Sequence, residues 1–166
     1  MRKLTLICCV LFVGLSASHA FAQHPLTFLH GDWVGPGKTS GLIASIRFTW
    51  KPAFGGQYTV LQLHNRMTGE DGQEFVFEGI GYYLAAEEQT LTGVWIDSQG
   101  NILPLQATLE GQTLTAMWGT QETKLGRSVY RLLPDGKLEA VNSISAENGE
   151  WQEFGRAVLS RTNSTP

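Results

Sequence analysis

Residues 74–84 read Glu-Phe-Val-Phe-Glu-Gly-Ile-Gly-Tyr-Tyr-Leu, and their alternation decides the fold class. One face of this stretch would carry Phe75, Phe77, Gly79, Gly81 and Tyr83, and the other would carry Glu74, Val76, Glu78, Ile80, Tyr82 and Leu84. Successive side chains of a β-strand point to opposite faces, so a period of two is typical of a strand with one buried face. The stretch therefore predicts a β-strand.

The same period of two continues on both sides of this strand. It is found at 57–67, 103–109 and 137–145, and turn residues (Gly, Asp, Asn and Pro) separate the runs at intervals of about ten residues, as in sandwiches and barrels. No stretch of helical length has a period of 3.6, and only 25–30 could form a helical turn. The chain is therefore predicted to be all-β.

Two architectures could bury such strands, a sandwich or a barrel. Short hairpin connections throughout favour an antiparallel up-and-down barrel of about 8–10 strands, because closure leaves no unpaired edge. A sandwich with Greek-key crossings would need a longer connection, and the only candidate, 119–126, is short.

The first 22 residues have the pattern of a signal peptide. Arg2 and Lys3 precede an uncharged apolar run over 4–15, and Ala20-Phe21-Ala22 has the small-x-small form that signal peptidase cleaves. The run is shorter than the ~20 residues that span a bilayer. We expect cleavage after Ala22, with cleavage after Ala20 as the alternative, and a single barrel domain over 23–166 that is periplasmic or secreted.

Cleavage would change the composition of the chain. Both cysteines lie within 1–22, so residues 23–166 can form neither a disulfide nor a thiolate site. They hold ten basic and fifteen acidic residues, a net charge of −5. This mild acidity gives no attraction to nucleic acid, and no membrane anchor remains. The composition does not indicate an oligomeric state.

Several short motifs resemble a known superfamily. Gly31-x-Trp33 resembles the first-strand signature of lipocalins and other calycins, and Gly31-x-Trp33-x-Gly35-x-Gly37 is similar to the opening of nitrobindin-type and related uncharacterised bacterial barrels. The likeness extends to Gly79-x-Gly81-Tyr82, Trp95-x-Asp97, Trp118-Gly119 and Arg161. It implies a lipocalin-like calycin barrel.

The resemblance also implies roles for particular residues. In calycins the first-strand tryptophan, here Trp33, closes one barrel end beneath an arginine of the last strand, for which Arg161 is the first candidate and Arg156 the second. Nitrobindin-like barrels hold haem through a histidine late in the chain, but this sequence has no histidine after His64. We therefore expect no haem or other cofactor, and no metal site.

Eight residues are candidates for ligand binding, each with a structural alternative. The candidates are His64, Arg66, Glu78, Tyr82, Trp95, Trp118, Arg127 and Tyr130. The charged residues could instead be solvated on the outer face, and the tryptophans could be core. Since Leu61, Leu63 and Met67 alternate with His64 and Arg66, only one of the two sets can face inward. We expect Leu63 in the core.

Three classes of function remain open from the sequence. The first is an exported barrel that binds a small, largely apolar or aromatic ligand. The second is an enzyme, for instance a cyclase or isomerase with His64 as acid–base beside Arg66 or Glu78. The third is an envelope interaction or inhibitor module that acts through its outer surface. No catalytic residue is assigned, and fold alone does not decide among the three.

Overall fold

The alternating runs form ten strands in the computed structural model, which describes residues 24–87 and 89–162. The strands are β1 (Gly31–Thr39), β2 (Leu42–Ala53), β3 (Tyr58–Thr68), β4 (Glu74–Glu87), β5 (Thr90–Asp97), β6 (Ile102–Glu110), β7 (Thr113–Trp118), β8 (Gly126–Leu132), β9 (Leu138–Ser145) and β10 (Trp151–Thr162). Two short 3-10 helices, η1 (Thr27–Leu29) and η2 (Phe54–Gly56), complete the elements. The predicted helical turn over 25–30 corresponds to η1.

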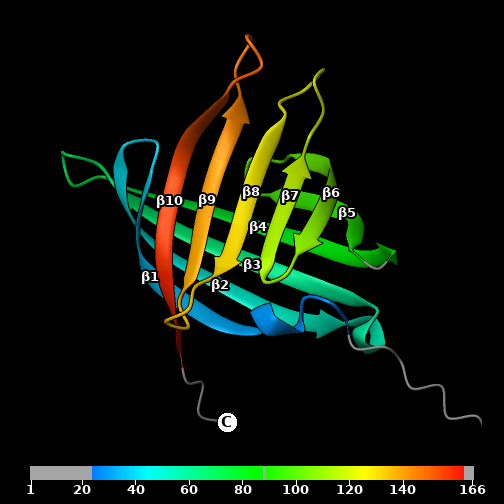
Figure 1. Cartoon of the computed structure of the whole chain (residues 1–166). Coiled ribbons are helices and arrows are strands. Elements are labelled where there is room, and N and C mark those ends of the chain that lie inside the picture. The colour runs from blue at the N-terminus through cyan, green and yellow to red at the C-terminus, as the bar shows by residue number, and fades with distance from the viewer. Residues whose placement is uncertain (1–23, 88, 163–166) are drawn as a thin grey trace, which may run out of the picture.

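The ten strands close into one antiparallel barrel (Figure 1). Each strand pairs with the next in the sequence, and β10 returns to pair with β1, with Trp33 opposite Arg161. A meander of this kind needs only hairpin connections, and its closure leaves no free edge strand. The prediction of an all-β up-and-down barrel is confirmed, and the sandwich alternative is excluded.

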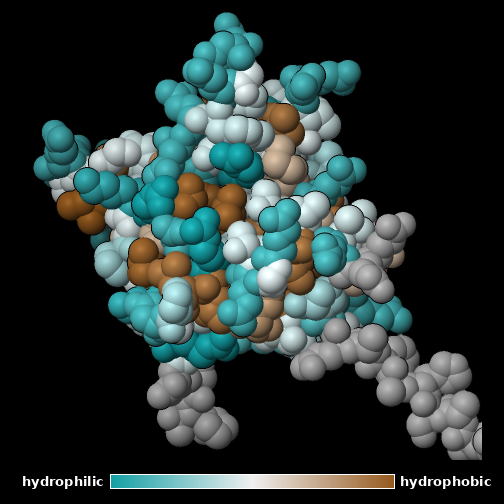
Figure 2. Space-filling view, in the orientation of Figure 1, coloured by the Kyte–Doolittle hydropathy of each residue, from teal (hydrophilic) through white to brown (hydrophobic). Residues whose placement is uncertain are grey.

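The two ends of the barrel differ. At one end, which we call the closed end, η1 lies across the opening and Leu26, Leu29 and Trp33 are fully buried. The opposite end, which we call the mouth, carries the turns that join β1 to β2, β3 to β4 and β5 to β6, and the loops that follow β7 and β9. Figure 2 shows hydrophilic residues at the tips of the loops that rise above the mouth in this view.

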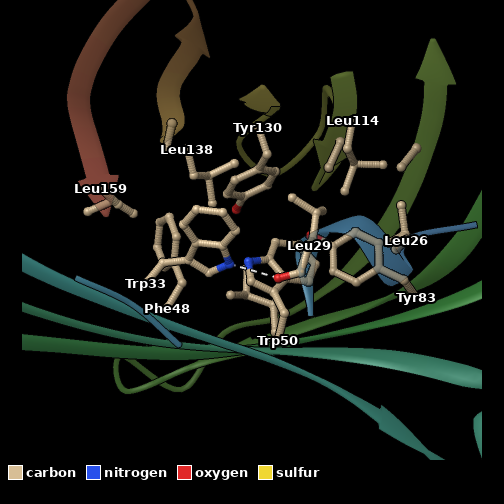
Figure 3. Close-up of a cluster of buried hydrophobic side chains, with 14 of the residues drawn as sticks. Leu26, Leu29, Trp33, Phe48, Trp50, Tyr83, Leu114, Tyr130, Leu138 and Leu159 are labelled. Atoms are coloured by element: carbon tan, nitrogen blue, oxygen red, sulfur yellow. Dashed lines mark hydrogen bonds between the residues drawn. The ribbon is translucent and has the colours of Figure 1, made fainter. Parts of the chain in front are cut away.

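The tightly packed core occupies the closed half of the barrel (Figure 3). Trp33 donates its indole N–H to the carbonyl of Leu29 at 2.7 Å, and Trp50 packs against Tyr83 and Tyr130 with ring centroids 5.4 and 5.2 Å apart. Fully burying one large apolar side chain contributes about 1.5–3 kcal/mol. These side chains fill the closed half of the described barrel, and a cavity lies towards the mouth.

The predicted signal peptide over 1–22 lies outside the described residues. Within residues 24–87 and 89–162, no helix has the length and apolar character needed to cross a bilayer.

Candidate ligand-binding site

The mouth half of the barrel contains a cavity of about 870 Å³. Its floor is formed by Phe48, Tyr83 and Tyr130, which also form the upper layer of the core. Its apolar walls are formed by Ile46, Leu63, Met67, Phe75, Phe77, Trp95, Leu103, Leu105, Trp118, Ile144 and Phe154. The volume lies within the ~300–1,000 Å³ range of small-molecule sites, and a mostly apolar lining is typical of such sites.

Two glycines keep this space open, because each lies beneath a tryptophan of the neighbouring strand. A Cβ added at Gly79 would lie 2.2 Å from the Trp95 ring, and one added at Gly126 would lie 2.0 Å from the Trp118 ring. Each indole therefore lies close against the barrel wall, in space that a side chain would otherwise take. With any larger residue at 79 or 126, the indole would have to move towards the cavity.

The protein itself uses the indole N–H groups of both tryptophans. Trp95 donates to Oδ2 of Asp97 at 3.3 Å, and Trp118 donates to Oγ of Ser128 at 3.1 Å. Indole has no other hydrogen-bonding atom. Trp95 and Trp118 can therefore offer a ligand only the apolar surface of their rings.

The two floor tyrosines are held as neutral phenols. Burial raises the pKa of Tyr130 to about 12, although hydrogen bonds with Ser128 and Tyr83 act in the opposite direction. Burial, together with the neighbouring Tyr130, raises the pKa of Tyr83 well above its ordinary value. Neither side chain carries a charge near neutral pH, so the floor of the cavity is uncharged.

Polar side chains in the cavity lie at defined places. Asn65 is buried and donates from Nδ2 to Oγ1 of Thr39 at 3.1 Å. Ser128 donates to Oδ1 of Asn142 at 2.7 Å. The carboxylate of Asp97 accepts backbone and side-chain N–H groups of its own turn, from Gln99 and Asn101, as well as the Trp95 indole. The Asp97 charge therefore stabilises the β5–β6 turn.

Three of the eight predicted binding residues line this cavity, namely Trp95, Trp118 and Tyr130. Their placement agrees with the ligand-binding prediction, and contact with a ligand stays a prediction.

The other five predicted residues lie on the outer face of the barrel, outside this cavity, and ligand contact at these residues stays a prediction. His64 and Glu78 form an exposed pair with Nδ1 and Oε1 3.1 Å apart, and Arg66 lies 3.7 Å from Glu74. Tyr82 is half-buried outside the cavity. Arg127 is also half-buried outside the cavity. Its guanidinium lies 4.5 Å from the ring centroid of Trp151 on the outer face.

The physical reason is the choice between the two faces of a strand. On β3, Leu61 is buried and Leu63 and Met67 pack against the core, so His64 and Arg66 must face water. The expectation that Leu63 faces inward is confirmed. On β4, Tyr83 belongs to the set of residues that face inward, and Tyr82 belongs to the set that face outward.

Sequence reasoning missed most of the cavity walls. The period of two at 103–109 predicts the strand that carries Leu103 and Leu105 but assigns neither residue to a site, and no pattern in the sequence indicates Ser128 or Asn142. A signal for the cavity was present in Gly79 and Gly126. Gly126 pairs directly with Trp118, and Gly79 pairs with Asp97, two residues beyond Trp95, so each glycine leaves room for a flat ring.

The closed end confirms the role that the resemblance gave to Trp33. The guanidinium of Arg161 lies 4.2 Å from the Trp33 ring centroid, a cation–π contact worth about 0.5–2 kcal/mol. Arg161 also donates to the carbonyls of Phe28 and His30, so it ties the segment around η1 to the last strand. Arg156, the second candidate, pairs instead with Glu139 and Glu153.

Two histidines hold the same segment from the other side. His24 Nε2 lies 3.1 Å from the carbonyl of Tyr83, which requires it to carry the proton, and Nδ1 accepts from the Leu26 N–H at 3.3 Å. The Thr59 hydroxyl lies 3.0 Å from both His24 Nδ1 and His30 Nε2. A consistent arrangement has His30 donating to Thr59 and Thr59 donating to His24. Burial lowers the pKa of both imidazoles, and nearby His24 and Arg161 lower the pKa of His30 further.

The residues of the cavity do not fit a haem held by histidine, which the nitrobindin resemblance implies. Neither histidine nor cysteine is among the described side chains that line the cavity. His24 and His30 lie at the closed end, and His64 lies on the outer face. In the described part of the chain, no three His, Cys, Asp or Glu side chains gather where they could hold a metal ion.

Comparison with known proteins supports the fold alone. No protein-family model matches the chain, and no curated protein matches it. The crystal structure of Rv2717c from M. tuberculosis is similar with a TM-score of 0.61 and 18% identity, over 83% of this chain and 95% of that chain. The redesigned β-barrel mFAP1, bound to DFHBI, is 15% identical over 82% of this chain and 97% of its own, with a TM-score of 0.36. No conclusion about this chain follows from the similarity to mFAP1 at that TM-score.

Proposed function

We propose that this protein is an exported binding protein that holds a small, largely apolar or aromatic molecule in the mouth half of its barrel. The observation that carries the proposal is the cavity of about 870 Å³, which has apolar walls and a floor of neutral phenols. Displacing water from apolar surface favours binding by roughly 25 cal/mol for each Å² buried. Trp95 and Trp118 add flat ring surfaces, on which an aromatic group can stack.

Binding can be tested with 2-acetylnaphthalene as a probe, measured by isothermal titration calorimetry. Leu103 and Ile102 are neighbours on β6 that face opposite ways, since Leu103 lines the cavity and Ile102 is 72% exposed. Leu103→Trp fills part of the cavity and should weaken binding at least tenfold. Ile102→Trp, the matched control, should leave it unchanged. The proposal fails if the wild-type protein shows no saturable binding, or if both variants bind as the wild type does.

The natural ligand can be sought by native mass spectrometry of protein purified from its own periplasm. A reproducible mass above that of the polypeptide, lost in the Leu103→Trp variant, is the expected result. The same spectrum tests export, because the proposed cleavage after Ala22 gives a chain that begins at Gln23 and whose mass reductant does not change. An envelope fraction that contains only chains beginning at Met1 would contradict export.

No observation supports acid–base catalysis by His64 and Glu78 inside the barrel. His64 lies on the outer face with 41% of its side chain exposed, next to Glu78, which is 64% exposed, and neither residue lines the described cavity. A general acid or base works within hydrogen-bond reach of a bound substrate. We therefore do not propose catalysis by this pair.

A further inference from the structure

A chain of hydrogen bonds fixes the direction in which one cavity amide points. The Trp118 indole can only donate, and it donates to Oγ of Ser128 at 3.1 Å. The Ser128 hydroxyl also interacts with Tyr130, but its contact of 2.7 Å is with Oδ1 of Asn142, to which it donates. That distance is typical of O–H···O bonds and shorter than most N–H···O bonds. The oxygen of Asn142 is therefore the atom that faces Ser128.

This orientation leaves the amide nitrogen of Asn142 free for a ligand. Within the part of the chain that the structure describes, Asn142 Nδ2 donates to no protein acceptor, and Asn142 is only partly buried and lines the cavity. Gly155 of the adjacent strand leaves room beside the amide, since a Cβ at that position would lie 3.4 Å from Nδ2. Two N–H groups of Asn142 are thus available, in apolar surroundings that include Phe154 and Ile144.

We propose that Asn142 is a specificity-determining residue, which binds a hydrogen-bond acceptor oxygen on the ligand through Nδ2. The inference rests on the proposed function and narrows its ligand class to apolar or aromatic molecules that carry a carbonyl or similar oxygen. The aromatic part lies along the Trp118 side of the cavity, because Trp118 and Asn142 are joined through Ser128. Ser128 acts as a positioning residue that holds the amide in this direction.

Asn65 differs from Asn142, although both amides line the cavity. Its Nδ2 already donates to Thr39, and its Oδ1 is fully buried without a partner, so a ligand can reach neither atom without turning the side chain. The Tyr83 and Tyr130 hydroxyls interact with each other, and Tyr130 also interacts with Ser128. Of these four side chains, Asn142 is the one whose donor is both free and open to the cavity. Asn65 provides a matched control.

The test compares two probes of similar shape, 2-acetylnaphthalene and 2-ethylnaphthalene, which differ by one carbonyl oxygen. Isothermal titration calorimetry gives the ratio of their dissociation constants, ethyl over acetyl, for each variant. One hydrogen bond contributes about 0.5–1.5 kcal/mol, so Asn142→Leu should lower the ratio by about 2- to 12-fold. Asn142→Asp keeps the shape and removes the donor, so it should lower the ratio as well, even if the leucine variant does not fold.

Two further variants separate recognition from packing. Asn65→Leu should leave the ratio at the wild-type value, whereas Ser128→Ala should lower it partly, because the amide is no longer held in one direction. Ratios within twofold of the wild type for both Asn142 variants would overturn the inference and leave the binding function intact. If neither naphthalene binds the wild-type protein, the proposed function itself fails.

Discussion

Replacing Gly126 with alanine tests whether a glycine makes room for the Trp118 ring. The new Cβ would lie 2.0–2.2 Å from three ring carbons of Trp118, whereas carbon atoms pack at about 3.5–4.0 Å. The indole must therefore shift by about 1.5 Å, towards the cavity. Such overpacking costs about 1–3 kcal/mol.

The same shift breaks the hydrogen bond from Trp118 to Ser128, which contributes about 0.5–1.5 kcal/mol more. We expect Gly126→Ala to lower the free energy of unfolding by about 1.5–4.5 kcal/mol, measured by urea denaturation at pH 7.5. Binding of 2-acetylnaphthalene should weaken as well, because the displaced ring occupies part of the cavity.

Gly155 provides the control for this change. A Cβ at Gly155 meets its nearest neighbour at 3.4 Å, an ordinary contact, so Gly155→Ala should stay within about 0.5 kcal/mol of the wild type. If the two alanine variants are equally stable, the argument that Gly126 makes room for the Trp118 ring is refuted.

Three other predictions concern the core, the closed end and the cavity. Leu63→Asp buries an unpaired charge and should unfold the protein, whereas Gln62→Asp on the outer face should change the free energy of unfolding by less than about 0.5 kcal/mol; circular dichroism distinguishes the two. Burial lowers the pKa of His24 and His30 in the folded protein, so below about pH 6.5 the unfolded chain binds more protons than the folded chain. The free energy of unfolding should therefore decrease as the pH is lowered below about 6.5. His24→Gln should weaken this pH dependence, as urea titrations at pH 7.5 and 5.5 would report. Added hemin should give no Soret shift of the kind that histidine ligation produces, and a stoichiometric shift would contradict the cavity described here.

Alternation in the sequence predicts the strands and the barrel, because a period of two repeats at nearly every run and the turn residues separate the runs. The helical turn before β1 and the pairing of Trp33 with Arg161 were also predicted, the latter through the calycin resemblance. Each of these depends on neighbouring residues or on a short motif. Membership of the calycin superfamily stays a prediction.

The candidate site was less predictable, because alternation separates two faces without saying which one is inside. On β4 the adjacent Tyr82 and Tyr83 are chemically alike, and only packing against Trp50 makes Tyr83 the inner residue. On β3 the polar residues suggested a binding surface, but burying Leu61 and Leu63 is more favourable than burying His64. The bond from Ser128 to Asn142 joins β8 to β9, and its geometry appears only in the folded barrel.

The closed end also determines how the protein can be tethered to a solid support. The first and last described residues, His24 and Thr162, both lie there, on the side of the barrel opposite the mouth. A tether joined to the chain beyond either residue would therefore leave the mouth turned away from the support. Protein immobilised on a sensor chip by either route should present its opening to the flowing solution, which suits the barrel to use as a small-molecule detector.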